Sequence, residues 1–175
     1  WLVDMRRFDG EALADRLAER RALGLPSMLA LGLAVSRMHA SAPECRGTRA
    51  GASALRWVVD GNTASLAHDG DTHFPAAEVE ALATQSTAAC DRAASLLDRR
   101  AARGRVRRCH GDLHLRNVVL LDGRPTPFDA VEFNDDISCI DIGYDLAFLL
   151  MDLWRRQLPR HANLVLNRYL AETGD

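Results

Sequence analysis

The sequence predicts an α+β fold that is mostly helical and carries one small β-hairpin. Long segments with helical periodicity or helix-forming composition cover much of the chain, at residues 10–22, 27–40 and 76–103. The turn signal Asp122-Gly123 separates two short segments that are rich in apolar residues. A length of 175 residues, with 47% hydrophobic residues and a formal net charge of −2, suits one globular domain.

The N-terminal elements follow from local patterns. Residues 1–8 predict a short strand that runs into a polar connection, and residues 10–22 predict a helix. Pro26 suits the first turn of the next helix. Residues 27–40 are apolar almost all round, which predicts a helix buried on all sides. The small and polar residues 41–53 predict a loop.

The middle of the chain predicts strands around one long helix. Residues 56–59 (RWVV) predict a brief strand before a turn at Asp60-Gly61-Asn62. The Ala-rich segment 76–103 predicts a helix that ends near Gly104. Residues 106–109 predict a second short strand.

The C-terminal part predicts two further helices. Asp141 is the expected N-cap of the first, because apolar residues of the following segment share one helical face. Pro159 is expected to open the second, which runs to about residue 172.

Composition excludes several classes of protein. All 22 basic residues are Arg, and 24 acidic residues balance them, so the charge predicts no nucleic-acid partner. The arginines crowded at 99–108 fit a solvated helix end better than a nucleic-acid patch. No apolar segment reaches the roughly 18 residues of a membrane span, and no signal peptide is visible, which predicts a cytoplasmic protein. The first residue is not Met, so we expect a clipped sequence.

The four cysteines predict reduced thiols. Cys45, Cys90, Cys109 and Cys139 are widely spread and include no C-x-x-C pair, so their spacing suits neither a zinc finger nor a disulfide framework. Packed, reduced thiols in a cytosolic protein are the expectation.

Three oxygen-bearing side chains are predicted to converge beside the hairpin. Asp112 is followed five residues later by Asn117, and Asp129 follows after a strand, a turn and a strand. With predicted strands 117–121 and 126–131, residues equidistant from the turn oppose each other, which places Asn117 near Phe128 and Asp129. Carboxylate and amide oxygens suit Mg²⁺ that bridges phosphates.

The segment His110-Gly-Asp-Leu-His-Leu-Arg-Asn117 resembles the catalytic loop of the aminoglycoside phosphotransferase and choline kinase family, which shares the protein-kinase-like fold. The segments 128–132 (FDAVE) and 145–147 (DLA) resemble the metal-binding segment and the following helix of that family. The resemblance implies that Asp112 is the catalytic base and that Asn117 and Asp129 hold Mg²⁺. It also implies transfer of the ATP γ-phosphate to a hydroxyl of a small molecule.

Five supporting residues are singled out with less specific roles. The resemblance implies that Asp145 holds the backbone of the catalytic loop. His110 is expected to brace the loop by hydrogen bonding. His114 and Arg116 are candidates for contact with the transferred phosphate. Glu132 is a candidate for a role at the metal, with an ordinary salt bridge as the alternative.

A closer resemblance concerns the bacterial branch in which this phosphotransferase is fused to a P-loop ATP-binding domain. Residues 3–8 (VDMRRF) are similar to a V-R-M-R-R-F segment of that branch, from which Asp4 departs. Residues 1–8 are then the end of the small lobe and the hinge, with Met5 and Arg6 at the adenine. Residues 9–175 are the large, C-terminal lobe, truncated at both ends.

The sequence lacks parts that a complete kinase of this kind uses. It has no Lys, no glycine-rich phosphate loop and no G-x-x-x-x-G-K-[ST] motif. We therefore expect the fragment alone to be inactive, with the small lobe and a fused P-loop domain as missing partners.

Two alternatives remain open at this point. One is a hydrolase in which His110, Asp112 and His114 hold a transition metal, because imidazole and carboxylate at alternate positions can ligate one ion. The other is an inactive kinase-like remnant that serves as a binding module. The sequence does not identify the acceptor substrate.

Overall fold

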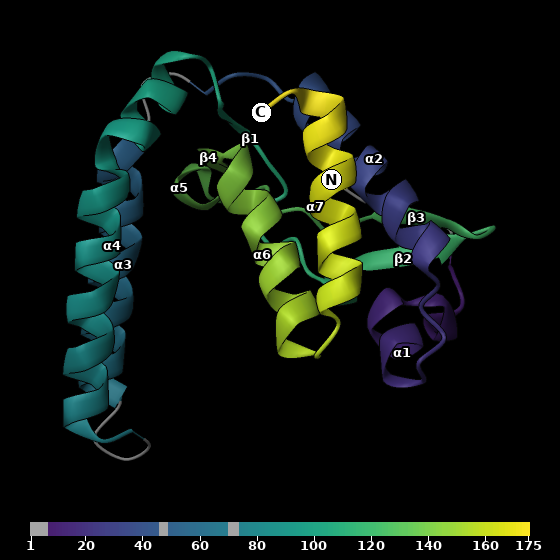
Figure 1. Cartoon of the computed structure of the whole chain (residues 1–175), viewed down its shortest axis with the longest axis horizontal. Helices are drawn as coiled ribbons and strands as arrows, with labels where there is room; N and C mark the ends of the chain where they lie inside the picture. Colours follow the sequence, from purple (N-terminus) through teal and green to yellow (C-terminus); the bar gives the residue numbers. More distant parts are fainter. Residues whose placement is uncertain (1–6, 46–48, 70–73) are drawn as a thin grey trace.

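The computed structural model describes residues 7–45, 49–69 and 74–175, and it confirms the α+β, mostly helical fold class (Figure 1). Two antiparallel two-stranded sheets lie between the helices. In chain order the elements are η1 (Gly10–Ala12), α1 (Ala14–Glu19), α2 (Leu25–Ser41), α3 (Gly51–Asp69), α4 (Ala76–Ala102), β1 (Val106–Arg108), η3 (Leu115–Asn117), β2 (Val118–Leu121), β3 (Arg124–Pro127), α5 (Asp135–Ser138), β4 (Cys139–Asp141), α6 (Ile142–Arg155) and α7 (Pro159–Thr173).

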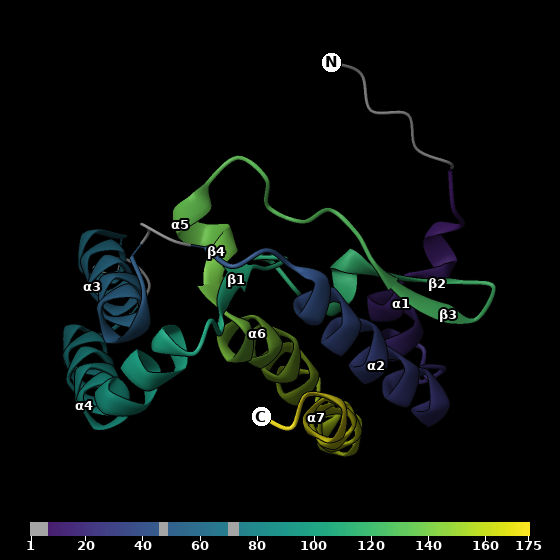
Figure 2. The ribbon, with the colours of Figure 1, turned by 90° about the horizontal axis from the view of Figure 1, so that it is seen from above.

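The main core lies between α2, α6, α7 and the β2–β3 hairpin (Figure 2). Gly32 lets α2 approach α7 closely, because a Cβ at this position would lie 2.8 Å from the carbonyl oxygen of Val165. Only one side of α2 is buried, and Leu29 on its other side is 43% exposed. The prediction that this helix is buried on all sides is therefore wrong.

The hairpin has the predicted turn and register. Asp122 and Gly123 have φ values of 50° and 76°, as a two-residue type I′ turn requires. Val118 faces Pro127, so Asn117 is next to Phe128, whose N–H donates to the Asn117 carbonyl at 3.0 Å. The return strand is shorter than predicted, because the chain leaves the ladder after Pro127 and turns towards the loop that precedes β2.

Helices α3 and α4 form a long antiparallel pair that stands to one side of the core (Figure 1). The strand predicted at 56–59 and the turn predicted at residues 60–62 are wrong, since both segments are helical within α3. The predicted loop at 41–53 ends sooner, at the start of α3. Packing against α4 overrides the local β-propensity of these residues. The predicted strand at residues 1–8 is not formed at residues 7 and 8, and residues 1–6 lie outside the described residues.

The second sheet connects the end of α2 to the C-terminal half of the chain. Strand β1 pairs with β4, and its other edge meets Glu44 in an isolated bridge at Arg107. The Arg107 guanidinium donates to the carbonyls of Ala40 and Ala42 at 3.0 and 2.9 Å, which satisfies the C-terminal end of α2. This arginine from the crowded 99–108 segment is thus a structural anchor.

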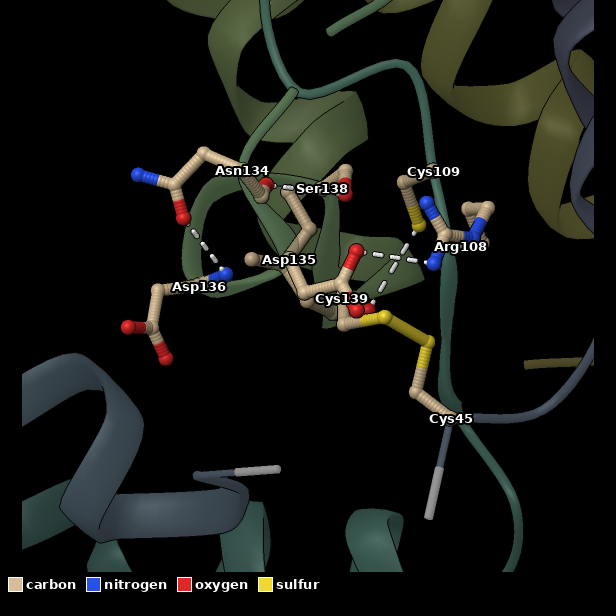
Figure 3. Close-up of a disulfide and its surroundings, with 9 residues drawn as sticks. Cys45, Arg108, Cys109, Asn134, Asp135, Asp136, Ser138 and Cys139 are labelled. Carbon is tan, nitrogen blue, oxygen red and sulfur yellow. Dashed lines mark hydrogen bonds and ion pairs between the residues drawn. A yellow bond between two sulfur atoms is a disulfide. The ribbon is translucent and has the colours of Figure 1, made fainter. Parts of the chain in front are cut away.

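The prediction that all four cysteines are reduced is wrong for two of them. Cys45 and Cys139 form a disulfide across a sequence separation of 94 (Figure 3). The pairing of β1 with both Glu44 and β4 brings these two cysteines together, and their sequence spacing carries no sign of it. Cys90 and Cys109 are free and buried.

We predict that the disulfide stabilises the fold by about 2–4 kcal/mol, because it restricts the unfolded chain. Replacing Cys45 with Ser should lower the free energy of unfolding in urea by that amount. Dithiothreitol should lower the wild-type value similarly and leave Cys45→Ser unchanged. Equal urea midpoints for oxidised and reduced wild-type protein would contradict the prediction.

Candidate active site

The loop from His110 to Asn117 connects β1 to β2, and its path depends on a glycine. Gly111 has a φ of 79°, a value that side chains rarely adopt. A Cβ at Gly111 would lie 3.1 Å from the Ile137 carbonyl oxygen and 3.1 Å from the Val131 Cβ. Backbone conformation and close packing therefore both require glycine immediately before Asp112.

Asp112 and Asn117 are in direct contact. The Asn117 Nδ2 donates to the Asp112 carboxylate and to the Asp112 carbonyl, both at 3.0 Å. His114 Nε2 lies 3.3 Å from the other carboxylate oxygen of Asp112. The Asp112 side chain is 45% exposed, so it is oriented by two neighbours and still accessible. No described residue is a hydrogen-bond partner of the Asn117 amide oxygen, so this oxygen is available to another group.

Asp129 is held beside this pair through its backbone neighbours. The Phe128 N–H donates to the Asn117 carbonyl, and the Val131 N–H donates to the His110 carbonyl at 2.8 Å. Asp129 itself has a φ of 61°. The other three non-glycine residues with positive φ in the described part of the chain follow helices or form the hairpin turn, at Arg21, Asp122 and Gln157. Strained conformations of this kind gather at functional sites.

The His110 side chain forms a hydrogen bond that braces the loop, and none of its hydrogen bonds goes to the Asp112 side chain. Its Nε2 lies 2.8 Å from the Phe128 carbonyl oxygen, and because a carbonyl can only accept, Nε2 carries the proton. Its buried Nδ1 has no hydrogen-bond partner among the described residues. This bond joins the start of the loop to the residue that precedes Asp129.

Asp145 connects the loop to three helices. One oxygen of its carboxylate accepts from the Gly111 N–H at 2.8 Å, and the other lies 3.4 Å from the His110 nitrogen. The second oxygen also accepts from His39 Nε2 at 2.9 Å, and His39 Nδ1 lies 2.8 Å from the Tyr169 hydroxyl. Burial raises the pKa of Tyr169, which keeps its hydroxyl protonated. His39 and Tyr169 were not identified from the sequence, because in the sequence each is a single residue within a helix and nothing indicates that the two are in contact.

Asp152 supports the other end of the loop from the same helix. It lies two turns after Asp145 on α6, and its carboxylate accepts from the Leu115 N–H at 3.1 Å. Burial alone would raise the pKa of Asp152. The bond from Leu115 and the guanidinium groups of Arg155 and Arg156 outweigh burial and lower the pKa. The sequence pattern that could have revealed Asp152 is its seven-residue spacing from Asp145.

A buried cluster of potential metal ligands lies behind the loop, and its chemistry does not suit a metal. His39, Cys109 and Asp145 offer atoms within 4.8 Å of one another. Burial, with the nearby carboxylates Asp145 and Asp141, raises the pKa of the Cys109 thiol, whereas a metal ligand must be a thiolate. His39 and Asp145 are already bonded to each other.

The transition-metal site considered for a hydrolase is not formed. Within the described ranges the one ligand cluster is the buried group named above, and it includes none of His110, Asp112 and His114. The His110 Nε2 is directed at a carbonyl of the hairpin instead.

The remaining predicted site residues lie apart from the Asp112–Asn117 contact or cannot be placed. Arg116 is 74% exposed, and its Nε lies 4.0 Å from a carboxylate oxygen of Asp15. Glu132 is exposed and makes no hydrogen bond or ion pair with the residues that the structure describes. Met5 and Arg6 lie outside the described residues.

Comparison with known proteins identifies the family. The model of the phosphotransferase enzyme family matches residues 3–174, so the chain belongs to that family. It is 30% identical to an uncharacterised protein of Mycobacterium bovis and to uncharacterised proteins of two strains of Mycobacterium tuberculosis. Each match covers 99% of this chain and 35% of the relative, so the chain spans about a third of the relatives' length. No solved structure matches the chain.

The family and the structure together define the fold class, which is the α+β, mostly helical lobe of a kinase-like phosphotransferase. None of the described helices is long and apolar enough to cross a membrane.

We predict that Asp152 stabilises the fold in a pH-dependent way. Because its folded-state pKa is lowered, its contribution is present above the unfolded carboxyl pKa of about 3.9 and is lost as the pH falls through the folded-state value. Replacing Asp152 with Asn should lower the free energy of unfolding by about 1–3 kcal/mol at neutral pH.

Urea unfolding at neutral pH and near pH 3 measures this difference, which should shrink at the lower pH. The control is Glu19→Gln, which breaks an exposed ion pair with Arg16 and should change little at either pH. A difference for Asp152→Asn that stays constant across the two pH values would refute the assignment.

Proposed function

We propose that the chain is the catalytic lobe of a phosphotransferase that moves the γ-phosphate of Mg-ATP to a hydroxyl group of a small molecule. The observation that carries the proposal is the contact between Asp112 and Asn117, with Asp129 fixed at the neighbouring backbone position. Phosphoryl transfer needs a carboxylate for the acceptor hydroxyl and hard oxygen ligands for the metal.

Asp112 fits the role of the base. Its carboxylate is accessible, and Asn117 and His114 hold it in one orientation. A hydroxyl placed against it would donate its proton to the carboxylate as the oxygen attacks phosphorus. The hydrogen bond from Asn117 and the close approach of His114 limit the rotation of the carboxylate, which favours one geometry for the acceptor.

Asn117 and Asp129 fit the role of metal ligands. The Asn117 amide nitrogen is used by Asp112, which leaves its oxygen as a ligand. Asp129 is exposed, and it lies two residues beyond Pro127, the hairpin residue that pairs with Val118 next to Asn117. Magnesium held there would neutralise charge on the phosphates.

The nucleotide site would be completed partly by residues near the start of this chain and partly by segments of the full-length protein outside it. Met5 and Arg6 are proposed at the adenine, and a lysine of a small lobe is proposed at the phosphates. His114 and Arg116 are proposed near the transferred phosphate, and Glu132 near the metal. Because the relatives are about three times longer than the match, the activity proposed here is that of the full-length protein.

We predict that substitutions at Asp112 and Asp129 differ in kind. Asp112→Asn keeps the shape of the side chain but removes the proton acceptor, so turnover should fall about 10²- to 10⁴-fold while nucleotide binding persists. Asp129→Asn removes a charged ligand, so activity should also require more Mg²⁺. The measurement is phosphate transfer by the full-length protein across a magnesium series.

The matched control is Asp122→Asn, the same chemical change in the hairpin turn, where Asn tolerates the positive φ. This variant should retain wild-type turnover and magnesium dependence. Wild-type turnover in Asp112→Asn would rule out the proposed mechanism. A remnant that only binds would show no transfer in any variant, including the wild type.

A further inference from the structure

A pocket opens directly beside the catalytic loop. Its volume is about 280 Å³, close to the lower limit for small-molecule sites. Its walls come from the middle of α3, from α6, and from the segment of α5 and β4, and Gly111 forms part of it. Gly111 is bonded through one peptide to Asp112, so the two Cα atoms are about 3.8 Å apart. A molecule in this pocket therefore lies against the backbone residue that directly precedes the proposed base.

The lining of the pocket is aromatic and aliphatic. Trp57 on α3 lines it together with Tyr144 and Phe148 on α6, whose rings pack edge to face at 6.2 Å. Val58 and Ile140 add aliphatic surface. Surfaces of this kind favour flat, apolar ligands, because aromatic rings contribute both buried area and ring-to-ring contact.

The pocket offers little to a cation. Asp136 is the one charged residue in its lining, and its carboxylate lies 3.6 Å from the guanidinium of Arg49. Arg49 also lies over the Trp57 ring, 4.6 Å from its centroid. Both the carboxylate and one aromatic face thus already have a cationic partner, and a ligand with several ammonium groups would find no free carboxylate in this lining.

A glycine in the middle of α3 faces the same space. Gly61 lines the pocket, and a Cβ at this position would meet nothing within 4 Å. Glycine inside a helix costs about 1 kcal/mol relative to alanine. Packing within the chain does not require a glycine here, whereas a ligand in the pocket would need the space.

We propose that this pocket binds the phosphate acceptor, and that the acceptor is an uncharged molecule with a hydroxyl group on a flat aromatic or apolar body. The inference rests on the proposed phosphotransferase function and names its substrate class. In the reaction, the acceptor oxygen forms the new bond to phosphorus, the bond from that phosphorus to ADP breaks, and the hydroxyl proton passes to Asp112.

Binding can be tested on this chain without nucleotide. Naphthalenemethanol is the neutral aromatic probe and kanamycin is the polycationic probe, each titrated by calorimetry. Naphthalenemethanol should bind and kanamycin should not. Trp57→Ala should weaken naphthalenemethanol binding about tenfold, because one aromatic wall is lost. Trp154→Ala is the matched control, since Trp154 also lies on a helix, is 65% exposed and does not line the pocket.

A second pair of variants separates blocked binding from a damaged fold. Gly61→Leu fills the pocket and should abolish naphthalenemethanol binding, while the urea midpoint stays the same or rises because leucine favours a helix. Gly61→Ala adds one methyl group and should bind within about threefold of the wild type. Kanamycin binding in preference to naphthalenemethanol, or equal affinity in Trp57→Ala and Trp154→Ala, overturns the proposal. Unchanged binding in Gly61→Leu overturns it as well.

The two proposals fail in different experiments. If naphthalenemethanol binds as expected but the full-length protein transfers no phosphate to any alcohol, the phosphotransferase function is wrong. If the full-length protein phosphorylates kanamycin and naphthalenemethanol does not bind, the function stands and the acceptor class is wrong.

Discussion

The buried carboxylate of Asp145 makes the interactions on which the arrangement of the candidate active site depends. A carboxylate removed from water costs several kcal/mol unless hydrogen bonds replace the lost hydration. Asp145 is 1% exposed, and its partners are the backbone N–H groups at the start of the 110–117 loop and the imidazole of His39. These partners cannot move away from Asp145 without leaving buried oxygen atoms of its side chain without hydrogen bonds. The loop, α2 and α6 are therefore fixed to one another.

Asp152 is a second anchor for the loop, and the loop has one buried face and one accessible face. Because Asp152 holds the Leu115 N–H two turns further along α6, the loop is fixed at both ends against one helix. Between the anchors the side chains alternate, and Leu113 and Leu115 are fully buried while Asp112 and His114 remain accessible. The accessible polar side chains are thus carried by a loop whose leucines are packed in the core. This packing limits the movement of the groups that would contact a substrate.

Local signals in the sequence predicted what depends on local physics. The Asp122-Gly123 turn set the hairpin register, Asp141 capped α6 as expected, and the long Ala-rich segment formed α4. The features that the sequence did not predict share one cause, which is contact between segments that are distant in the chain. Packing of α3 against α4 made a helix of residues with strand propensity. The pairing of β1 with two other segments created a disulfide that spacing did not reveal. The His39–Tyr169 contact spans 130 residues and could be found only in three dimensions.

The Cys45–Cys139 bridge changes the covalent topology of the chain. It closes a ring that contains α3, α4, the 110–117 loop and the whole hairpin. Asp112, Asn117 and Asp129 all lie inside this ring, while the helices α2, α6 and α7 that support them lie outside it. A single cut in the backbone between residues 46 and 138 would thus leave the two pieces covalently joined. Such a nicked molecule would migrate as one species in a denaturing gel until a thiol was added.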